Sequence, residues 1–550
     1  MFARTSARTS APLGALALLV AWGSSASAQP KGPPFYDPER SLKAQDEAAK
    51  EAKEQARTGG VEQVLPLLAD ASVAVREAVL EVLVGRNDER LLAGLERYLG
   101  HREEFIAAQV AELYGLTRYA KGREALERYG LRSKSEMTVL ESIWALQALG
   151  DAQAAKALEK TFQRRHPASE FRVQGDALIA LAHLDPKRAR EHVANALTDK
   201  RPPLVIAGLV ALQAIEPAAA ARAAVDVIAA KPMDRKLAGW EGRLLFAALE
   251  TLERWPERDS DRELAVSAVD ALIARLAREE DGLPKHKVAL ALAELTGEPL
   301  GDDPSIWSGW WGPRKGSFTF PAKQAPAEEA GKGKKKAAKE QGDGPGRPET
   351  GGGGTRVRFH GIPIYSTRIL FAQDVSGGMR NPVDKDVPGS PAKMDFANTE
   401  LKRVLAALHE RVLTNVAFFA TDCKFTAERV VPIGKVRHQL IEFVDRESTA
   451  PDGYGMNRSN LYDTIVAGMS DPDIDTIYFL SEGGPNEGLF VESTRFMRHL
   501  TRLNVYTRVQ VQCLQVTASN YGQKFLRALA AGTGGEYYDL EFLKKAHGLK

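Results

Sequence analysis

A pair of aliphatic residues three positions apart recurs near the ends of successive helical stretches between Ser41 and Gly297. Successive pairs are separated by 30, 36, 35, 31, 37 and 43 residues, a period typical of two-helix repeats. One such repeat cannot bury its apolar face alone, so neighbouring repeats stack into a continuous core. The pattern predicts an α-helical solenoid over residues 41–312, with a non-repetitive helical bundle as the alternative. The pairs are Leu80/Leu83, Val110/Leu113, Leu146/Leu149, Leu181/Leu184, Leu212/Ile215, Leu249/Leu252 and Leu292/Leu295.

Residues 70–79 resemble the turn and the second-helix start of a HEAT-type repeat, in which an aspartate caps the helix and Val-Arg opens it. The resemblance implies that the solenoid is HEAT-like. Near its end, Trp307, Trp310 and Trp311 lie close together in the sequence. We expect this Trp-rich stretch to cover the exposed end of the stack, because buried aromatic area is the commoner use of such clusters. A carbohydrate-binding platform is the alternative.

The first 28 residues have the organisation of a secretory signal peptide. Arg4 and Arg8 precede a short apolar run, Pro12–Trp22, and Ala-Ser-Ala at the end of the segment supplies a small-x-small cleavage site. The run is shorter than the roughly 20 residues that a membrane span needs. We expect cleavage near Ala28, a periplasmic or secreted location, and an extended leader over residues 29–40. No later stretch of the sequence predicts a transmembrane segment.

Residues 313–355 differ from their surroundings by a high content of Lys, Gly and Pro. The segment contains a lysine cluster, Lys332–Lys336, ends in Gly351–Gly354, and has almost no aliphatic residues. It cannot offset its own ordering entropy, so we predict a disordered linker. The whole chain has a net charge of +2, from 74 basic and 72 acidic side chains, which indicates neither nucleic acid nor a membrane surface as a partner.

From residue 356 to 550, short apolar runs alternate with amphipathic helical stretches. The links are long enough for helical crossovers, which predicts an α/β doubly wound (Rossmann-like) domain with a mostly parallel sheet. The polar run 424–433 follows its neighbour too closely for a crossover, so we expect it to return antiparallel at the sheet edge. The expected strands are 368–372, 415–420, 476–480 and 505–516, and the expected helices are 394–413, 461–469, 492–503 and 521–531.

Four blocks of this region resemble the von Willebrand factor A (VWA) domain in their order and spacing. The first, residues 374–378 (Asp-Val-Ser-Gly-Gly), stands where the family has Asp-x-Ser-x-Ser. Residues 458–463 resemble Gly-Thr-Asn-Leu-Tyr-Asp, residues 479–488 resemble Leu-Ser-Asp-Gly-x-Pro, and residues 532–538 resemble the closing Gly-Gly-x-Tyr strand. The whole chain resembles exported bacterial proteins that join helical repeats to a VWA domain.

The resemblance implies a metal-ion-dependent adhesion site that binds Mg²⁺ or Mn²⁺. Its positions are occupied by Asp374, Ser376, Ser459 and Glu482, where the last two replace the usual Thr and Asp. Gly378 stands in place of a serine ligand. Magnesium demands a near-octahedral shell of oxygen atoms at about 2.0–2.1 Å, so these changes make the site degenerate. The alternative is a loop without metal, in which Asp374 caps backbone amides.

The chain contains two cysteines, Cys423 and Cys513. The VWA resemblance places them on opposite sides of the central strands. Their Cα atoms would then be farther apart than the roughly 7 Å limit of a disulfide. The resemblance therefore implies two independent cysteines rather than a disulfide bond.

The sequence contains no motif that indicates catalysis. It lacks G-x-S-x-G, H-E-x-x-H and the phosphate-binding G-x-x-x-x-G-K-[ST]. We therefore expect an exported, non-enzymatic protein–protein interaction or adhesion-type protein, in which an acidic side chain of a protein partner completes the metal shell. The alternative is a structural or assembly scaffold, in which the concave surface of the solenoid binds the partner and the metal loop is inert.

Overall fold

The computed structural model of the chain describes residues 41–164, 166–167, 171–233, 237–255, 260–321, 356–447 and 458–549. The signal peptide and leader expected over residues 1–40 lie outside the described residues, as does most of the linker expected over 313–355. Within the described ranges, no helix is both long and apolar enough to cross a membrane.

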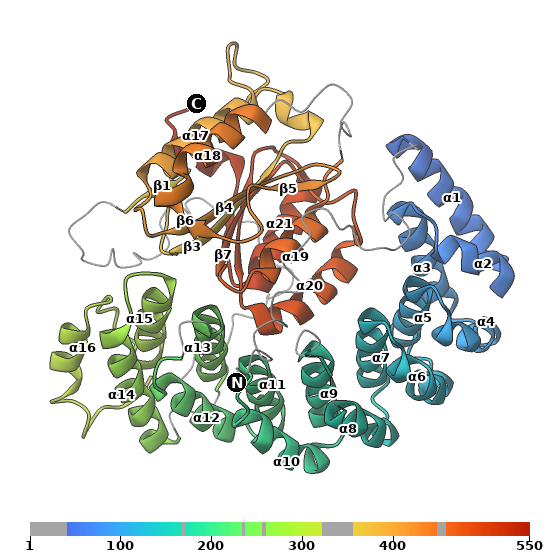
Figure 1. Cartoon of the computed structure of the whole chain (residues 1–550), viewed down its shortest axis with the longest axis horizontal. Helices are drawn as coiled ribbons and strands as arrows, with labels where there is room; N and C mark the ends of the chain where they lie inside the picture. Colours follow the sequence, from blue (N-terminus) through green and yellow to red (C-terminus); the bar gives the residue numbers. More distant parts are fainter. Residues whose placement is uncertain are drawn as a thin grey trace, which may run out of the picture.

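The first part of the described chain is a curved array of stacked helices, which Figure 1 shows as an arc. The odd-numbered helices form the inner row and the even-numbered helices form the outer row. The inner row consists of α1 (Leu42–Thr58), α3 (Val73–Arg86), α5 (Glu104–Thr117), α7 (Glu136–Leu149), α9 (Phe171–Leu184), α11 (Pro202–Ile215), α13 (Ala238–Glu253) and α15 (Leu283–Thr296). The outer row consists of α2 (Val61–Leu68), α4 (Glu89–Leu95), α6 (Arg123–Arg128), α8 (Ala155–Gln163), α10 (Pro186–Leu197), α12 (Pro217–Ala229), α14 (Arg262–Arg278) and α16 (Pro304–Trp311).

Aspartates begin several outer helices. The side chain of Asp88 accepts hydrogen bonds from two backbone amides in the first turn of α4, and Asp185 and Asp303 each accept a first-turn backbone amide of α10 and α16. Proline follows directly at the first position of α10 and α16, where its missing N–H leaves no helical hydrogen bond unmade. The Asp N-caps, followed by Pro in α10 and α16, therefore determine where these helices begin.

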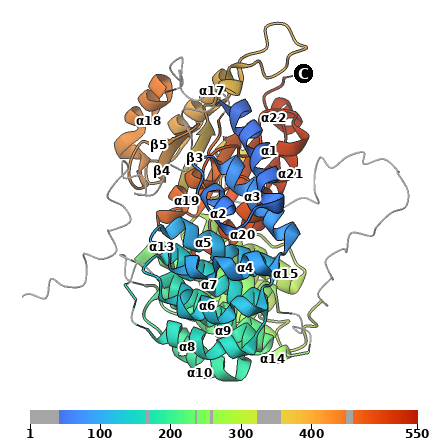
Figure 2. The same ribbon diagram turned by 90° about the vertical axis from the view of Figure 1, so that its right-hand side faces the viewer.

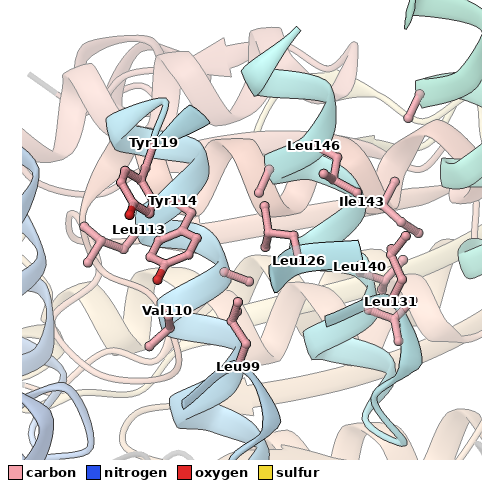
Figure 3. Packing of buried hydrophobic residues seen from close by; sticks show 14 of the residues in the cluster. Leu99, Val110, Leu113, Tyr114, Tyr119, Leu126, Leu131, Leu140, Ile143 and Leu146 are labelled. Carbon is pink, nitrogen blue, oxygen red and sulfur yellow. The ribbon is translucent and has the colours of Figure 1, made fainter. Parts of the chain in front are cut away.

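The recurring aliphatic pairs supply the core of the array. Val110 and Leu113 of α5 and Leu146 of α7 are buried between neighbouring helices (Figure 3). Leu212 and Ile215 of α11 are only partly buried and pack at the edge of the same cluster. Each helix pair thus buries its apolar face against the next pair rather than around a single centre.

The tryptophan stretch lies at the far end of the array. Trp307 and Trp311 are buried, and Trp311 packs against Phe318 and Phe320 from the chain that follows α16. The indole N–H of Trp311 donates to Asp270 Oδ1 on α14 at 2.9 Å. These contacts cover the end of the array, in agreement with a capping role.

The second part of the described chain is an α/β domain with one seven-stranded sheet. Its order is β5-β4-β3-β7-β8-β9, with β6 also paired to β4. Strands β5 and β6 are antiparallel to β4, and the remaining pairs are parallel. The strands are β3 (Arg368–Asp374), β4 (Leu413–Phe419), β5 (Cys423–Phe425), β6 (Val431–Pro432), β7 (Thr476–Ser481), β8 (Gln510–Gln515) and β9 (Tyr537–Tyr538), preceded by a hairpin of β1 (Arg358–Phe359) and β2 (Ile362–Pro363). A helical part followed by an α/β domain is thus confirmed.

Helices cover both faces of the sheet. One face carries α17 (Lys393–Ala407), α18 (Ile433–Glu447) and α22 (Leu540–Ala546). The other carries α19 (Leu461–Ser470), α20 (Ser493–Thr507) and α21 (Asn520–Thr533). The strand order reverses between β3 and β7, so a topological switch point lies at the carboxyl ends of these two strands.

Two of the expected strands differ from the structure. The run expected to start at residue 505 begins as strand only at Gln510, because Val505–Thr507 form the last turn of α20. The single edge strand expected over 424–433 is two short strands, β5 and β6, separated by a turn. Cys423 on β5 and Cys513 on β8 have three strands between them, and both are free.

The α/β domain lies inside the arc of the helical array (Figure 1), and in the turned view the first helices of the array stand in front of it (Figure 2). Helix α20 is held between the sheet and the inner helices, and its Tyr506 is buried in the core of the array. Gly175 on α9 permits this approach, because a Cβ at that position would overlap the Tyr506 hydroxyl group. The concave surface to which the scaffold alternative assigned a partner is therefore occupied by the chain's own domain.

Candidate functional site

The candidate site lies at the topological switch point, where β3 ends in Asp374. One carboxylate oxygen, Oδ1, accepts the backbone N–H of Ser376 at 2.8 Å, which turns the chain sharply after the strand. The next residues, Gly377–Arg380, form a short 3₁₀ turn. The carboxylate is fully buried, and the two glycines at the start of the turn are partly exposed.

The second oxygen of Asp374 binds two hydroxyl groups from other elements. Ser459 Oγ, just before α19, donates to Asp374 Oδ2 at 3.3 Å. Ser481 Oγ, at the end of β7, donates to the same atom at 3.1 Å. Asn486 fixes the first of these serines by accepting its backbone N–H at 2.7 Å. The structure therefore places Asp374, Ser376 and Ser459 close together, with Ser481 beside them.

Burial raises the pKa of Asp374 to about 6, and the nearby carboxylate of Glu482 adds to this increase. Hydrogen bonds from Ser376 and Ser481 stabilise the ionised form but do not outweigh the burial. The site thus contains a carboxylate in an environment that disfavours its charge.

Glu482 lies beside Asp374, but its charge is already paired. The ammonium group of Lys393, the first residue of α17, lies 2.5 Å from Glu482 Oε1, and the lysine side chain is only 5% exposed. The other oxygen, Oε2, occupies the space above Gly378, where a Cβ would overlap it. Thr517 Oγ1 lies 3.4 Å from the same ammonium group.

These residues fit a divalent cation poorly. Asp374, Ser376 and Ser459 supply oxygen atoms of the type that Mg²⁺ and Mn²⁺ prefer. However, Glu482 is bound to an ammonium group, and a metal ion beside Lys393 would meet a like charge. Mg²⁺ also tolerates little deviation from octahedral geometry, and Gly378 contributes no side-chain ligand.

Sequence reasoning missed Lys393 and did not assign Ser481. Ser481 belongs to the block 479–488 and directly precedes Glu482, so its place at the end of a predicted strand was a usable signal. Lys393 is 89 positions from its partner Glu482, and no local pattern connects them.

A second cluster of charged side chains lies where α20 crosses the helical array. Four successive inner helices, α3, α5, α7 and α9, each present one carboxylate to α20. Arg495 Nε donates to Glu112 at 2.8 Å, and Arg502 Nη1 donates to Glu141 at 2.8 Å. The carboxylates, which we call the acidic row, are Glu77, Glu112, Glu141 and Asp176, and the facing side chains of α20 are Arg495, Arg498, Arg502 and Tyr506.

Glu112, Glu141 and His499 have ligand atoms within 4.8 Å of one another, which is a spacing compatible with a metal ion. Arginines bind both carboxylates, however, so the cluster is better described as an ion-pair network. Burial acts to raise the pKa of Glu141, but the charge of Arg502 beside it lowers this pKa overall. Burial also lowers the pKa of His499 well below its ordinary value.

The acidic row also contacts the loop that carries the candidate site. The two carboxylate oxygens of Glu77 accept the backbone N–H groups of Val491 and Glu492 at 2.9 and 2.6 Å. These residues end the loop that begins at Glu482 and lead into α20. The helical array therefore fixes both α20 and one end of the switch-point loop.

No protein-family model and no curated protein matches this sequence. Among solved structures, the chain is similar to the PilB minor pilin from Streptococcus sanguinis at 14% identity, over 34% of this chain and 61% of the pilin, with a TM-score of 0.26. The chain thus spans about three fifths of the pilin's length. It is also similar to the complex of CpcE and CpcF of phycocyanin lyase from Nostoc sp. PCC7120, at 16% identity over 42% of this chain and 92% of that one, with a TM-score of 0.25. At these TM-scores neither likeness carries an argument about this chain.

Proposed function

We propose that this chain is an exported, non-enzymatic protein-binding protein, in which a VWA-type domain is cradled by a HEAT-like helical array. The observation that carries the proposal is the meeting of Asp374, Ser376, Ser459 and Glu482 at the switch point of the sheet. Open α/β sheets bind their ligands outside the carboxyl ends of the strands at such a point. The sheet order, with the first strand central and an antiparallel edge, supports the VWA assignment.

Burial favours binding over catalysis at this site. Asp374 and Ser481 are fully buried, so neither side chain is open to solvent in this structure. Among the described residues, the accessible groups at the site include Gly377, Gly378 and Glu482, together with the exposed ring of Tyr521 that lies over Gly484. These groups offer a surface that a protein partner can contact.

The packing of the two parts bears on the alternative, a scaffold whose solenoid binds the partner. The inner face of the array is covered by α20, so a partner there would have to displace the α/β domain. This arrangement favours the switch-point edge as the contact surface. Export is proposed from the signal-peptide pattern of residues 1–28.

Site-specific photo-crosslinking tests the proposal. A photoreactive amino acid replaces Tyr521, which is 58% exposed beside the site, and in a matched control it replaces Ile306, which is 50% exposed on α16. We expect a discrete crosslinked protein from position 521 and not from position 306. Ser459→Ala should weaken the crosslink, because it removes a hydroxyl group that orders the site. The same crosslinking experiment in the presence of a chelator determines whether crosslinking needs a divalent ion.

The reverse pattern, a partner crosslinked at position 306 and none at position 521, would contradict the proposal and support the scaffold alternative. The same partner crosslinked equally at both positions would also contradict it, because that result indicates contact without a defined surface.

A further inference from the structure

We propose that the ammonium group of Lys393 is the built-in cation of the switch-point site and makes this site independent of a divalent metal ion. The proposal concerns charge balance within the chain and does not depend on the proposed partner binding. It is drawn from the contacts among Lys393, Glu482 and Gly378.

The position of Lys393 is unfavourable unless a carboxylate compensates for it. It is the first residue of α17, where the positive end of the helix dipole disfavours a cation. Lys393 is also buried, and a buried ammonium group is strongly destabilising without a partner. Glu482 supplies the compensating charge at 2.5 Å, and Thr517 supplies a hydroxyl oxygen at 3.4 Å.

The two departures of the loop from the family pattern depend on each other. A side chain at position 378 would overlap Glu482 Oε2, so the glycine makes room for the glutamate. The extra methylene of the glutamate then carries its carboxylate to Lys393. A glutamate at position 482 together with a larger residue at position 378 would leave a steric overlap. A glycine at position 378 without the glutamate would leave Lys393 unpaired. The pair of changes therefore replaces a metal ligand set with an internal ion pair.

The charges around the site support the same conclusion. Asp374 ends β3 and Glu482 directly follows the neighbouring strand β7, so the site holds two carboxylates and needs a positive charge. Lys393 provides that charge from within the fold, at a distance of one hydrogen bond from Glu482. A divalent ion at the same place would be repelled by the ammonium group and would have to break its ion pair.

Metal titration of the full chain tests the proposal. For the wild-type protein, we expect no saturable Mn²⁺ binding by electron paramagnetic resonance and the same thermal midpoint in Mn²⁺ and in chelator. For Lys393→Met, we expect a lower midpoint in chelator, because two carboxylates remain without a cation. Added Mn²⁺ should bind this variant and raise its midpoint.

Two variants serve as controls. Lys402→Met removes another lysine of α17, one that is 38% exposed and paired with Asp445, and should behave as the wild type does. The double variant Lys393→Met/Glu482→Gln removes both charges of the pair and should gain no response to Mn²⁺.

Saturable Mn²⁺ binding by the wild type that Ser459→Ala abolishes would overturn the proposal, whether or not Lys393→Met folds. A folded Lys393→Met protein that binds no Mn²⁺ would also overturn it, because Lys393 would then not be what excludes the metal. Neither readout involves a protein partner, so failure here is separate from failure of the crosslinking experiment.

Discussion

Asp475 is a buried carboxylate directly before β7, at the end of the strand that faces the helical array. Its Oδ1 accepts hydrogen bonds from the hydroxyl groups of Ser366 and Thr476 at 2.5 and 2.9 Å. Burial raises its pKa to about 6, although these two hydrogen bonds act to lower it. The folded chain therefore holds a proton between about pH 4 and pH 6 that the unfolded chain has released. This carboxylate should lower the stability as the pH rises through that window, by about 3 kcal/mol in total.

Asp475→Asn should remove this pH dependence. The free energy of unfolding of the variant, relative to the wild type, should increase by about 3 kcal/mol between pH 4 and pH 7. Urea unfolding at four pH values measures the difference, with Asp422→Asn, an exposed aspartate, as the control. A difference that is constant with pH would show that Asp475 keeps an ordinary pKa in the folded protein.

Gly378 and Glu482 should be energetically coupled. Gly378→Ser alone should destabilise the protein by about 1–3 kcal/mol, because the new side chain overlaps Glu482 Oε2. Glu482→Asp alone should also destabilise it, because the shorter carboxylate draws back from Lys393. The double variant should be more stable than the sum of the two effects, by about 0.5–3 kcal/mol. Chemical unfolding of the wild type, the two single variants and the double variant gives this coupling energy. If the two effects are strictly additive, the side chains at positions 378 and 482 do not compete for the same space.

At the scale of residues, the sequence predicts the part of the site that lies on β3 and on the loop directly after it. Asp374 and Ser376 belong to a single motif after a strongly apolar run, so their closeness was predictable. The pairing of Lys393 with Glu482 depends on how α17 is placed against the end of β7. A contact of that kind is decided by tertiary packing, and no spacing rule within the sequence contains it.

Helix α20 packs on the sheet with one face and on the helical array with the other, and its sequence alone does not reveal the second contact. Phe496 and Leu500 pack on the sheet, while Arg495 and Arg502 lie toward the array. An amphipathic helix with arginines on one face is normally solvated on that face, so its second buried surface was not evident. Tyr506 is buried against α9, and this contact keeps Val505–Thr507 in α20 although these residues favour strands. The sequence therefore predicts the start of β8 at residue 505, five residues before its actual start at Gln510.

Arg495→Met should destabilise the contact between α20 and the array. Arg495 is buried and binds Glu112 and Gln109, so its removal leaves a buried carboxylate with one cation fewer. Leaving a buried charge without any partner costs about 3–5 kcal/mol, and because Arg498 still pairs with Glu112, the loss of stability should be smaller than that. Hydrogen exchange should accelerate in α20 and in α5, where Glu112 lies. Lys524→Met on the exposed side of α21 is the control, and faster exchange confined to α20 would contradict a shared interface.

At the scale of the whole molecule, the acidic row is the feature that joins the two parts. Its carboxylates come from four inner helices, and each repeat-like unit supplies one. Each of these residues, taken alone in the sequence, resembles an ordinary surface charge of a helical repeat. That they all contact α20 becomes evident only when the helices are stacked and α20 lies across them (Figure 1). The sequence could predict both parts, but not that one part occupies the concave face of the other.

If this interface holds the molecule together, the two parts should associate without a covalent connection. Residues 41–321 and 356–550, produced together as separate chains, should co-purify as a 1:1 complex. Arg495→Glu with Arg502→Glu should abolish the complex, because each glutamate would then face a carboxylate of the acidic row. Arg527→Glu, an exposed change on α21, should leave it intact. Size-exclusion chromatography with light scattering measures the stoichiometry. Retention of the complex after the double charge reversal would mean that apolar contacts such as that of Phe171 with Tyr506, rather than the ion pairs, decide the docking.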